Sequence, residues 1–175
     1  MKQKYFPSIE LSSLIIDQEF PVSMGNYHIH IWGKPQETNQ PPKNKSIQLV
    51  EEQFNELSLF YQAQYGLSLK ELKQTHGNCV VDADTHNEST PEADALFSEQ
   101  DNLALGIKTA DCVPILFFNT HRILFGGIHS GWRGLKANIL KSTLQTLALA
   151  HPDDRTDNFK FLIGPHIATH HYETE

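Results

Sequence analysis

Three residues that could bind a metal ion lie beside glycines or turns, at the edges of apolar segments. His76 occurs in "QTHGN", Cys112 in "TADCVP" and His129 in "GIHSGW". Two imidazoles and one thiolate with an open fourth position are typical of a catalytic zinc site rather than a closed structural one. Their wide separation in sequence leaves a second interpretation open, in which the cysteine packs as a small apolar residue and the histidines form hydrogen bonds in turns.

The segment "HSGWRGL" is the second feature that suggests chemistry. It joins an apolar, strand-like run to a predicted helix, so free backbone N–H groups are expected near residues 131–135. A helix N-terminus carries a partial positive charge and unpaired donors, which favour anions. We therefore predict an anion-binding turn beside His129, in which Gly131, Arg133 and Gly134 contact phosphate or another oxyanion.

Acidic residues accompany both segments. Asp111 directly precedes Cys112, where its carboxylate could orient a ligand or act as a base. Glu92 and Asp94 of "EADA" could reach the same face, but a structural role such as capping a loop is the expectation for both. The candidate catalytic residues are therefore Cys112, Asp111, His76 and His129.

The elements that would position these residues follow from the hydrophobic pattern. Apolar residues repeat with helical spacing over 46–65, with Ser46 as N-cap and Gly66 as the stop, and again over 135–150. Predicted strands are "YHIHIW", two short strands that turn near Gly77, "LALGIKT", "VPILFF", "RILFGGI" and "FKFLIG". Loops are predicted at 34–45 and 82–102. Because no regular βαβ period appears, we predict one α/β or α+β domain over 1–175 with mixed sheets.

Composition limits the partners. The net charge is −7 and the 14 Lys and Arg residues are scattered, which argues against nucleic acid and anionic membranes as partners. The N-terminus lacks the apolar core of a signal peptide, and the longest apolar run, "VPILFF", is too short to span a bilayer. Two cysteines do not form a disulfide framework and suit a reducing compartment. We expect a cytoplasmic protein.

From Gln74 onward, the chain resembles a known family. The segments "QTHG", "EADAL" followed by "TADCVPIL", "GGIHSGWRGL" and "IGPHIATHHYE" are similar, in the same order, to the multicopper polyphenol oxidoreductase (laccase) proteins, also called YfiH-like or peptidoglycan editing factors. The resemblance implies a four-layer α/β/β/α fold with a zinc ion bound by His76, Cys112 and His129. We also place Gln74 of the first segment among the substrate-binding residues.

The activity implied by the resemblance is phosphorolysis of purine nucleosides such as adenosine and inosine, with adenosine deamination in some members. Zinc is predicted rather than copper, because only His28 and His30 form a His-x-His pair and neither cysteine is flanked by histidine. Two alternatives remain open. One is amide hydrolysis in cell-wall precursor editing, with Cys112 as nucleophile. The other is a non-catalytic protein that zinc stabilises and that binds a partner.

The chain departs from the family outside the proposed zinc ligands. An expected arginine is replaced by Gln18, paired glycines by Phe20 and Pro21, an asparagine by Ile31, and an Asn-Arg pair by Gln53 and Phe54. Glutamine and phenylalanine do not replace a guanidinium that binds phosphate with two hydrogen bonds, so these changes weaken the phosphate-binding prediction. The sequence stops just after "YETE", where relatives usually continue, so a C-terminally shortened version of the fold is expected.

Overall fold

A computed structural model describes the backbone of residues 14–22, 25–32, 45–88 and 90–171, and the side chains of 27–31, 54–88 and 90–171. The chain divides into two compact units, one formed by residues 1–21 and 26–69 and the other by residues 22–25 and 70–175. Each unit is described by itself. The predicted single domain over 1–175 stays a prediction, as does the four-layer arrangement.

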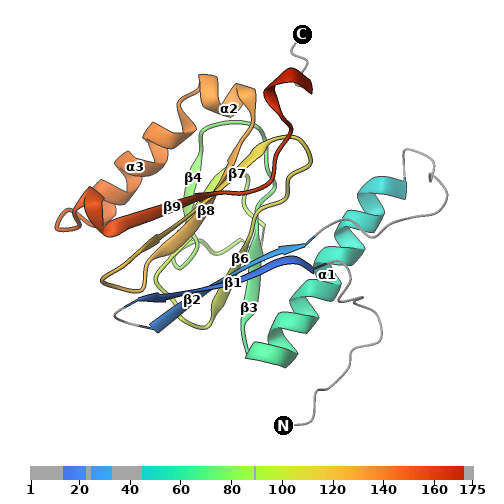
Figure 1. Cartoon of the computed structure of the whole chain (residues 1–175), viewed down its shortest axis with the longest axis horizontal. Helices are drawn as coiled ribbons and strands as arrows, with labels where there is room; N and C mark the ends of the chain where they lie inside the picture. Colours follow the sequence, from blue (N-terminus) through green and yellow to red (C-terminus); the bar gives the residue numbers. More distant parts are fainter. Residues whose placement is uncertain (1–13, 23–24, 33–44, 89, 172–175) are drawn as a thin grey trace. The chain divides into compact units, whose positions relative to one another are not determined.

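The first unit contains a strand pair and a long helix. Strands β1 (Leu14–Val22) and β2 (Gly25–Trp32) form a two-stranded sheet, and helix α1 spans Lys45–Tyr65 (Figure 1). The helix begins one residue before Ser46, which is therefore not its N-cap, and Gly66 ends it as predicted with a φ of +71°. Apart from Lys45, the loop predicted at 34–45 lies outside the described residues. No helix in the described ranges is both long and apolar enough to cross a bilayer.

The second unit is built on a five-stranded sheet in the order β4-β5-β8-β7-β9. Strands β4 and β5 are parallel, whereas the other pairs are antiparallel. Strand β3 pairs with β6 in a separate two-stranded sheet. These sheets confirm the predicted mixed α/β class. The strands are β3 (Ser68–Glu71), β4 (Val80–Asp82), β5 (Ala95–Ser98), β6 (Leu103–Gly106), β7 (Val113–Asn119), β8 (Phe125–Ser130) and β9 (Phe159–Ile163).

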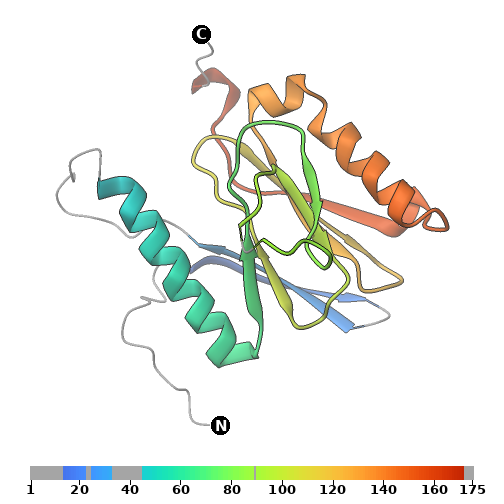
Figure 2. The same cartoon turned by 180° about the vertical axis from the view of Figure 1, so that it is seen from behind.

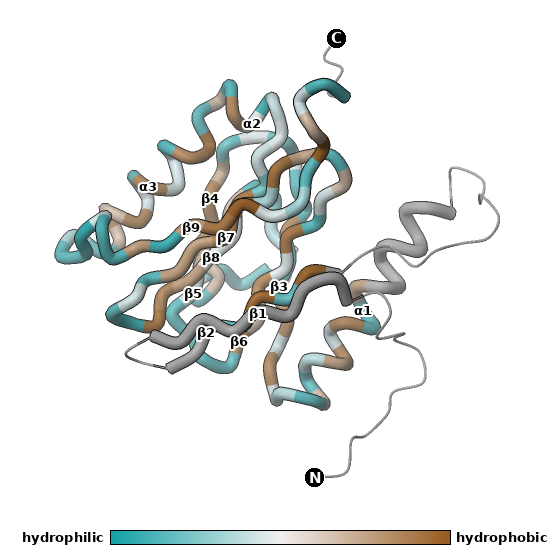
Figure 3. Tube along the Cα trace, in the orientation of Figure 1, coloured by the Kyte–Doolittle hydropathy of each residue, from teal (hydrophilic) through white to brown (hydrophobic). Residues whose placement is uncertain are grey.

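Alternating side chains of the large sheet contribute to two apolar clusters. On β5, Phe97 joins the cluster that includes Ile128 of β8 and Ile139 and Leu147 of helix α3 (Ile139–Ala150). The neighbouring Leu96 joins the other cluster, with Leu72, Val81 and Ala93. Figure 3 shows the hydrophobic stretch of β7, and Figure 2 gives the opposite view of the helices and the sheet. Apolar contact on both faces holds the central strands, and hence their ends, in fixed positions.

Two predicted elements were wrong. The loop predicted at 82–102 contains β5, a buried strand in the interior of the sheet, because four residues suffice once both neighbours pair with them. The single helix predicted at 135–150 is two helices, α2 (Trp132–Lys136) and α3, since Asn138 adopts a left-handed conformation with φ of 64°. Leu135 and Leu144, which belong to the apolar repeat over 135–150, are 56% and 45% exposed.

Candidate metal centre and substrate pocket

The structure brings His76, Cys112 and His129 together. Their ligand atoms all lie within 4.8 Å of one another. His76 lies in the turn between β3 and β4, Cys112 directly precedes β7, and His129 is on β8, where it pairs with Pro114. Because β7 and β8 are antiparallel, the start of one and the end of the other meet at the same edge of the sheet.

The spacing of the three residues suits a small metal ion. Ligand atoms around a tetrahedral zinc lie roughly 3.3 to 3.6 Å apart for bond lengths of about 2.0 to 2.3 Å. The observed upper limit of 4.8 Å leaves about an ångström to be closed by small side-chain rotations. The rings of His76 and His129 meet edge to face with 4.7 Å between their centroids. Nitrogen and sulfur donors together favour zinc or copper over magnesium or calcium.

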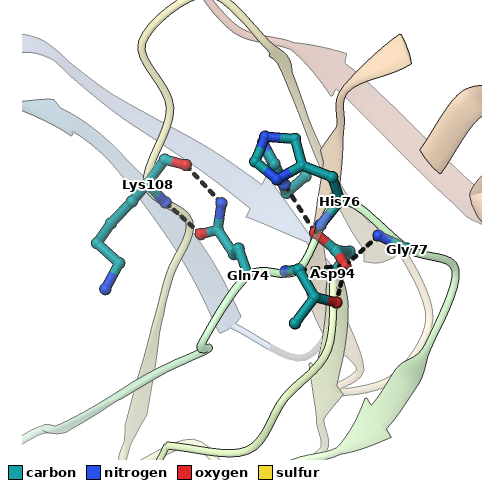
Figure 4. A network of polar contacts seen from close by, with 7 residues as sticks. Gln74, His76, Gly77, Asp94 and Lys108 are labelled. Atoms are coloured by element: carbon teal, nitrogen blue, oxygen red, sulfur yellow. Dashed lines mark hydrogen bonds and ion pairs between the residues drawn. The ribbon is translucent and has the colours of Figure 1, made fainter. Parts of the chain in front are cut away.

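Asp94 connects two of these ligands through a buried carboxylate (Figure 4). Its Oδ1 atom accepts hydrogen bonds from the backbone N–H of His76 at 2.9 Å and from Nδ1 of His129 at 2.8 Å. Its Oδ2 atom accepts from the Thr75 hydroxyl, the Thr75 N–H and the Gly77 N–H at 2.9, 3.2 and 2.7 Å. Since an ionised carboxylate only accepts, His129 carries its proton on Nδ1 and its Nε2 is left to bind a metal.

The turn that carries His76 is shaped around the same carboxylate. His76 has a φ of 60°, a left-handed conformation that non-glycine residues adopt in a few per cent of cases. This conformation lets three successive backbone N–H groups, from Thr75, His76 and Gly77, converge on Asp94. The strained backbone is therefore maintained by hydrogen bonds to a buried anion.

The protonation of the acidic groups follows from their surroundings. Burial raises the pKa of Asp94, but hydrogen bonds from His129, Gly77, Thr75 and His76 outweigh it and hold the pKa below its usual value. Burial raises the pKa of the Cys112 thiol, and the negative charges of Asp111 and Asp94 raise it further. Without a metal, Cys112 is therefore a protonated thiol at neutral pH, whereas a bound metal ion would deprotonate it.

Gly131 has no side chain at a point where the side chains of Cys112 and His76 lie close by. A Cβ atom at this position would lie 3.0 Å from Sγ of Cys112 and 3.0 Å from Cδ2 of His76. Gly131 is the buried residue that precedes α2, with an extended backbone that any residue could adopt. The requirement for glycine at this position is therefore steric.

If the three residues bind zinc, we expect Gly131→Ala to weaken that binding by about tenfold, because its methyl group would displace Cys112 and His76. Competition with a chromogenic chelator measures this affinity. Gly66→Ala is the matched control: a Cβ there has nothing within 4 Å, although its φ of +71° strains the backbone. The control should lower stability by about 1 kcal/mol and leave zinc affinity unchanged. Equal zinc affinities in the two variants would contradict the steric argument.

An open pocket of about 400 Å³ lies directly beside the ligands. Its lining includes His76 and Cys112 but also charged, aromatic and apolar side chains from other segments. These are Asp111, Trp132, Arg133, Ile167 and His171. A metal ion bound by the three ligands would therefore face a space that a small molecule can enter.

The other predicted site residues divide into two groups. Asp111 and Arg133 lie in the pocket lining, and their roles stay predictions. Gln74 does not, because its side-chain amide donates to the Lys108 carbonyl at 2.6 Å and accepts from the Lys108 N–H at 2.8 Å (Figure 4). Gly134 packs α2 against the turn of His76, since a Cβ there would lie 2.8 Å from the Gly77 carbonyl oxygen. Helix α2 is only five residues long, so Arg133, rather than the predicted helix end, is the candidate anion-binding group.

Sequence reasoning missed two residues of this region. The first is Asp94, which was expected to be structural and contacts both His76 and His129. Glu92, considered together with it, forms only an exposed ion pair with Lys73. His171 was not considered, although it lines the pocket. The motif "EADA" directly before an apolar run was the available signal for Asp94, because its single aspartate directly precedes a strand.

Comparison with known proteins identifies similar chains. The model of a family described as multi-copper polyphenol oxidoreductase laccase matches residues 45–175. A purine nucleoside phosphorylase of Rickettsia conorii is 33% identical over 135 residues, which cover 76% of this chain and 53% of the relative. The purine nucleoside phosphorylase YfiH of Escherichia coli is 32% identical over 102 residues, which cover 58% of this chain and 40% of the relative. The chain spans about half the length of the curated relatives it matches.

Solved structures show the same fold. A protein of Neisseria meningitidis superposes with a TM-score of 0.56 at 27% identity, over 75% of this chain and 50% of that one. The YfiH protein of Bacillus licheniformis superposes with a TM-score of 0.56 at 23% identity, over 67% of this chain and 48% of that one. In both comparisons the fold of this chain is similar to that of the solved structure.

Proposed function

The chain belongs to the multi-copper polyphenol oxidoreductase laccase family, and from this premise we propose that it is a zinc-dependent purine nucleoside phosphorylase of the cytoplasm. The observation that supports this most is the convergence of His76, Cys112 and His129, two of which, His76 and Cys112, line an open pocket. Relatives at 32 to 36% identity carry the name purine nucleoside phosphorylase. The proposed substrates are a purine nucleoside and inorganic phosphate.

The donor set fits zinc. Two imidazoles and a thiolate would leave a fourth zinc position without a protein ligand, and the hydrogen bond from His129 to Asp94 is the kind of outer contact that orients zinc-bound histidines. A zinc ion bound there would supply a Lewis acid next to the substrate. His76, Cys112 and His129 would hold the ion, and Asp94 would fix the orientation of one histidine and of the turn that carries the other.

The remaining pocket residues can position the reactants. Arg133 places a guanidinium in the lining, and such a group binds phosphate oxygens with two hydrogen bonds. Trp132 offers an aromatic surface in the same lining, with 36% of the residue exposed. The carboxylate of Asp111 can accept a hydrogen bond from a ribose hydroxyl or from a purine amino group. The same pocket would serve adenosine deamination, which we propose as a second activity.

The pKa of Cys112 disfavours the amide-hydrolysis alternative. A nucleophilic cysteine needs a lowered thiol pKa, whereas burial and two nearby carboxylates raise the pKa of this thiol. A metal ligand is deprotonated by the metal itself and needs no such lowering. The environment of Cys112 therefore favours metal binding over nucleophilic attack.

Product analysis tests the proposed function. We expect zinc-loaded protein to release free base from adenosine or inosine only when phosphate is present, and this release to stop on chelation and return when zinc is restored. Chromatography of the products measures both, and it detects deamination as inosine formed from adenosine. Turnover that survives complete removal of metal would contradict the zinc proposal. Absence of any turnover by folded, zinc-bound protein would favour the non-catalytic alternative.

A further inference from the structure

The segment after β9 folds back against the edge of the sheet that carries the metal ligands. The N–H of Gly164 donates to the Pro114 carbonyl at 2.9 Å, and the N–H of Ile167 donates to the Asp111 carbonyl at 3.1 Å. Both acceptors flank Cys112 in the sequence. The segment then ends in the short 3-10 helix η3 (Thr169–His171), which Figure 1 shows at the end of the described chain. Two backbone hydrogen bonds thus bring Ile167 and His171 into the pocket lining.

Arg133 provides a positive charge in the same lining. Its guanidinium carbon lies 4.5 Å from the centroid of the Trp132 ring, and no ion pair to a carboxylate is found for Arg133 within the described residues. Stacking on the indole restricts the side chain without using its N–H donors. These donors are therefore available to a ligand that enters the pocket.

The N–H donors of the pocket favour an anion. The carboxylate of Asp111 is the acidic side chain of the lining, and Arg133 offsets it. A metal dication would carry a charge of about +2, against about −1 for the Cys112 thiolate. With a metal dication bound, its charge would be offset by the Cys112 thiolate and the buried Asp94 carboxylate, and Arg133 and Asp111 would balance each other. The guanidinium and a neutral imidazole of His171 would still supply N–H donors.

We propose that His171 and Arg133 form an oxyanion subsite beside the metal ligands, and that this subsite takes inorganic phosphate. The inference rests on the proposed function and specifies which residues receive its second substrate. A tetrahedral oxyanion offers an oxygen to the guanidinium, to the imidazole N–H and to the metal side of the pocket at once. The subsite lies outside the three metal ligands, and one of its two residues comes from the segment that follows β9.

Calorimetric titration of zinc-loaded protein with inorganic phosphate, without nucleoside, tests the subsite. We expect the dissociation constant to rise about tenfold or more in His171→Ala and in Arg133→Met, because each removes a donor to a charged oxygen. His166→Ala and Lys136→Met are the matched controls. His166 lies in the same segment and Lys136 on the same helix, and neither lines the pocket. The controls should bind phosphate like the wild type.

The visible spectrum of the cobalt-substituted protein, recorded before phosphate is added, shows whether each variant keeps its metal site. Unchanged spectra together with weaker phosphate binding in both pocket variants would support the subsite. Phosphate binding by His171→Ala and Arg133→Met equal to that of the two controls would overturn it, as would a wild-type protein that binds no phosphate. Because the titration contains no nucleoside, these results are independent of whether free base is ever released.

Discussion

Replacing Cys112 by alanine is expected to reduce zinc affinity and the proposed phosphorolysis by roughly a hundredfold or more, because the change removes the thiolate from the three candidate ligands. The two remaining imidazoles are neutral donors and leave two positions of a tetrahedral ion without a protein ligand. Zinc content after dialysis and the rate of base release from inosine measure the two effects. Both should fall together, since the proposed reaction depends on the metal.

Cys79→Ala is the matched control for this change. Cys79 is the other cysteine of the chain, an exposed free thiol just before β4 and outside the three-residue cluster. Its removal should leave zinc content and rate unchanged. A Cys112→Ala protein that retains one zinc ion and the wild-type rate would refute the role of the thiolate. Loss of rate with full retention of zinc would instead show that Cys112 takes part in base release other than by binding the metal.

The sequence, together with the family resemblance, was sufficient to predict that His76, Cys112 and His129 lie close together, and to predict most of the strands around them. The apolar runs "VPILFF" and "RILFGGI" are long enough to mark β7 and β8 by composition alone, and Cys112 and His129 lie at ends that an antiparallel pairing brings together. His76 could be placed with them only through the family motif. Its position depends on a left-handed turn held by a residue eighteen positions away.

The missed features depend on contacts that local patterns do not contain. Strand β5 has four residues between acidic segments, so its flanks suggested a loop, whereas pairing with β4 and β8 makes it interior. Asn138 interrupts a helical hydrophobic repeat by adopting a left-handed conformation, which the repeat itself does not reveal. His171 enters the pocket through hydrogen bonds of Gly164 and Ile167 to the start of β7 and the residues before it.

The substitution Asp94→Asn is expected to weaken both the fold and the metal site. Each carboxylate oxygen accepts at least two hydrogen bonds, so in either orientation of an asparagine amide its NH2 group would face N–H donors and leave them without an acceptor. We expect the free energy of unfolding to fall by about 2 to 4 kcal/mol and zinc affinity to fall by about tenfold to a hundredfold. Chemical denaturation of metal-free protein and chelator competition measure these separately.

Glu92→Gln provides the comparison for Asp94→Asn, because Glu92 is two residues away and forms an exposed ion pair. Its side chain is 64% accessible, and that of its partner Lys73 is 68% accessible. It should leave both measurements unchanged.

Acidification gives an independent readout. Since the folded pKa of Asp94 lies below the ordinary 3.8, its ionised form stabilises the fold above that pH, and this stabilisation is lost as pH falls through the folded pKa. The stability difference between wild type and Asp94→Asn should therefore shrink below about pH 4. A difference that stays constant to lower pH would show that the carboxylate charge does not hold the turn of His76.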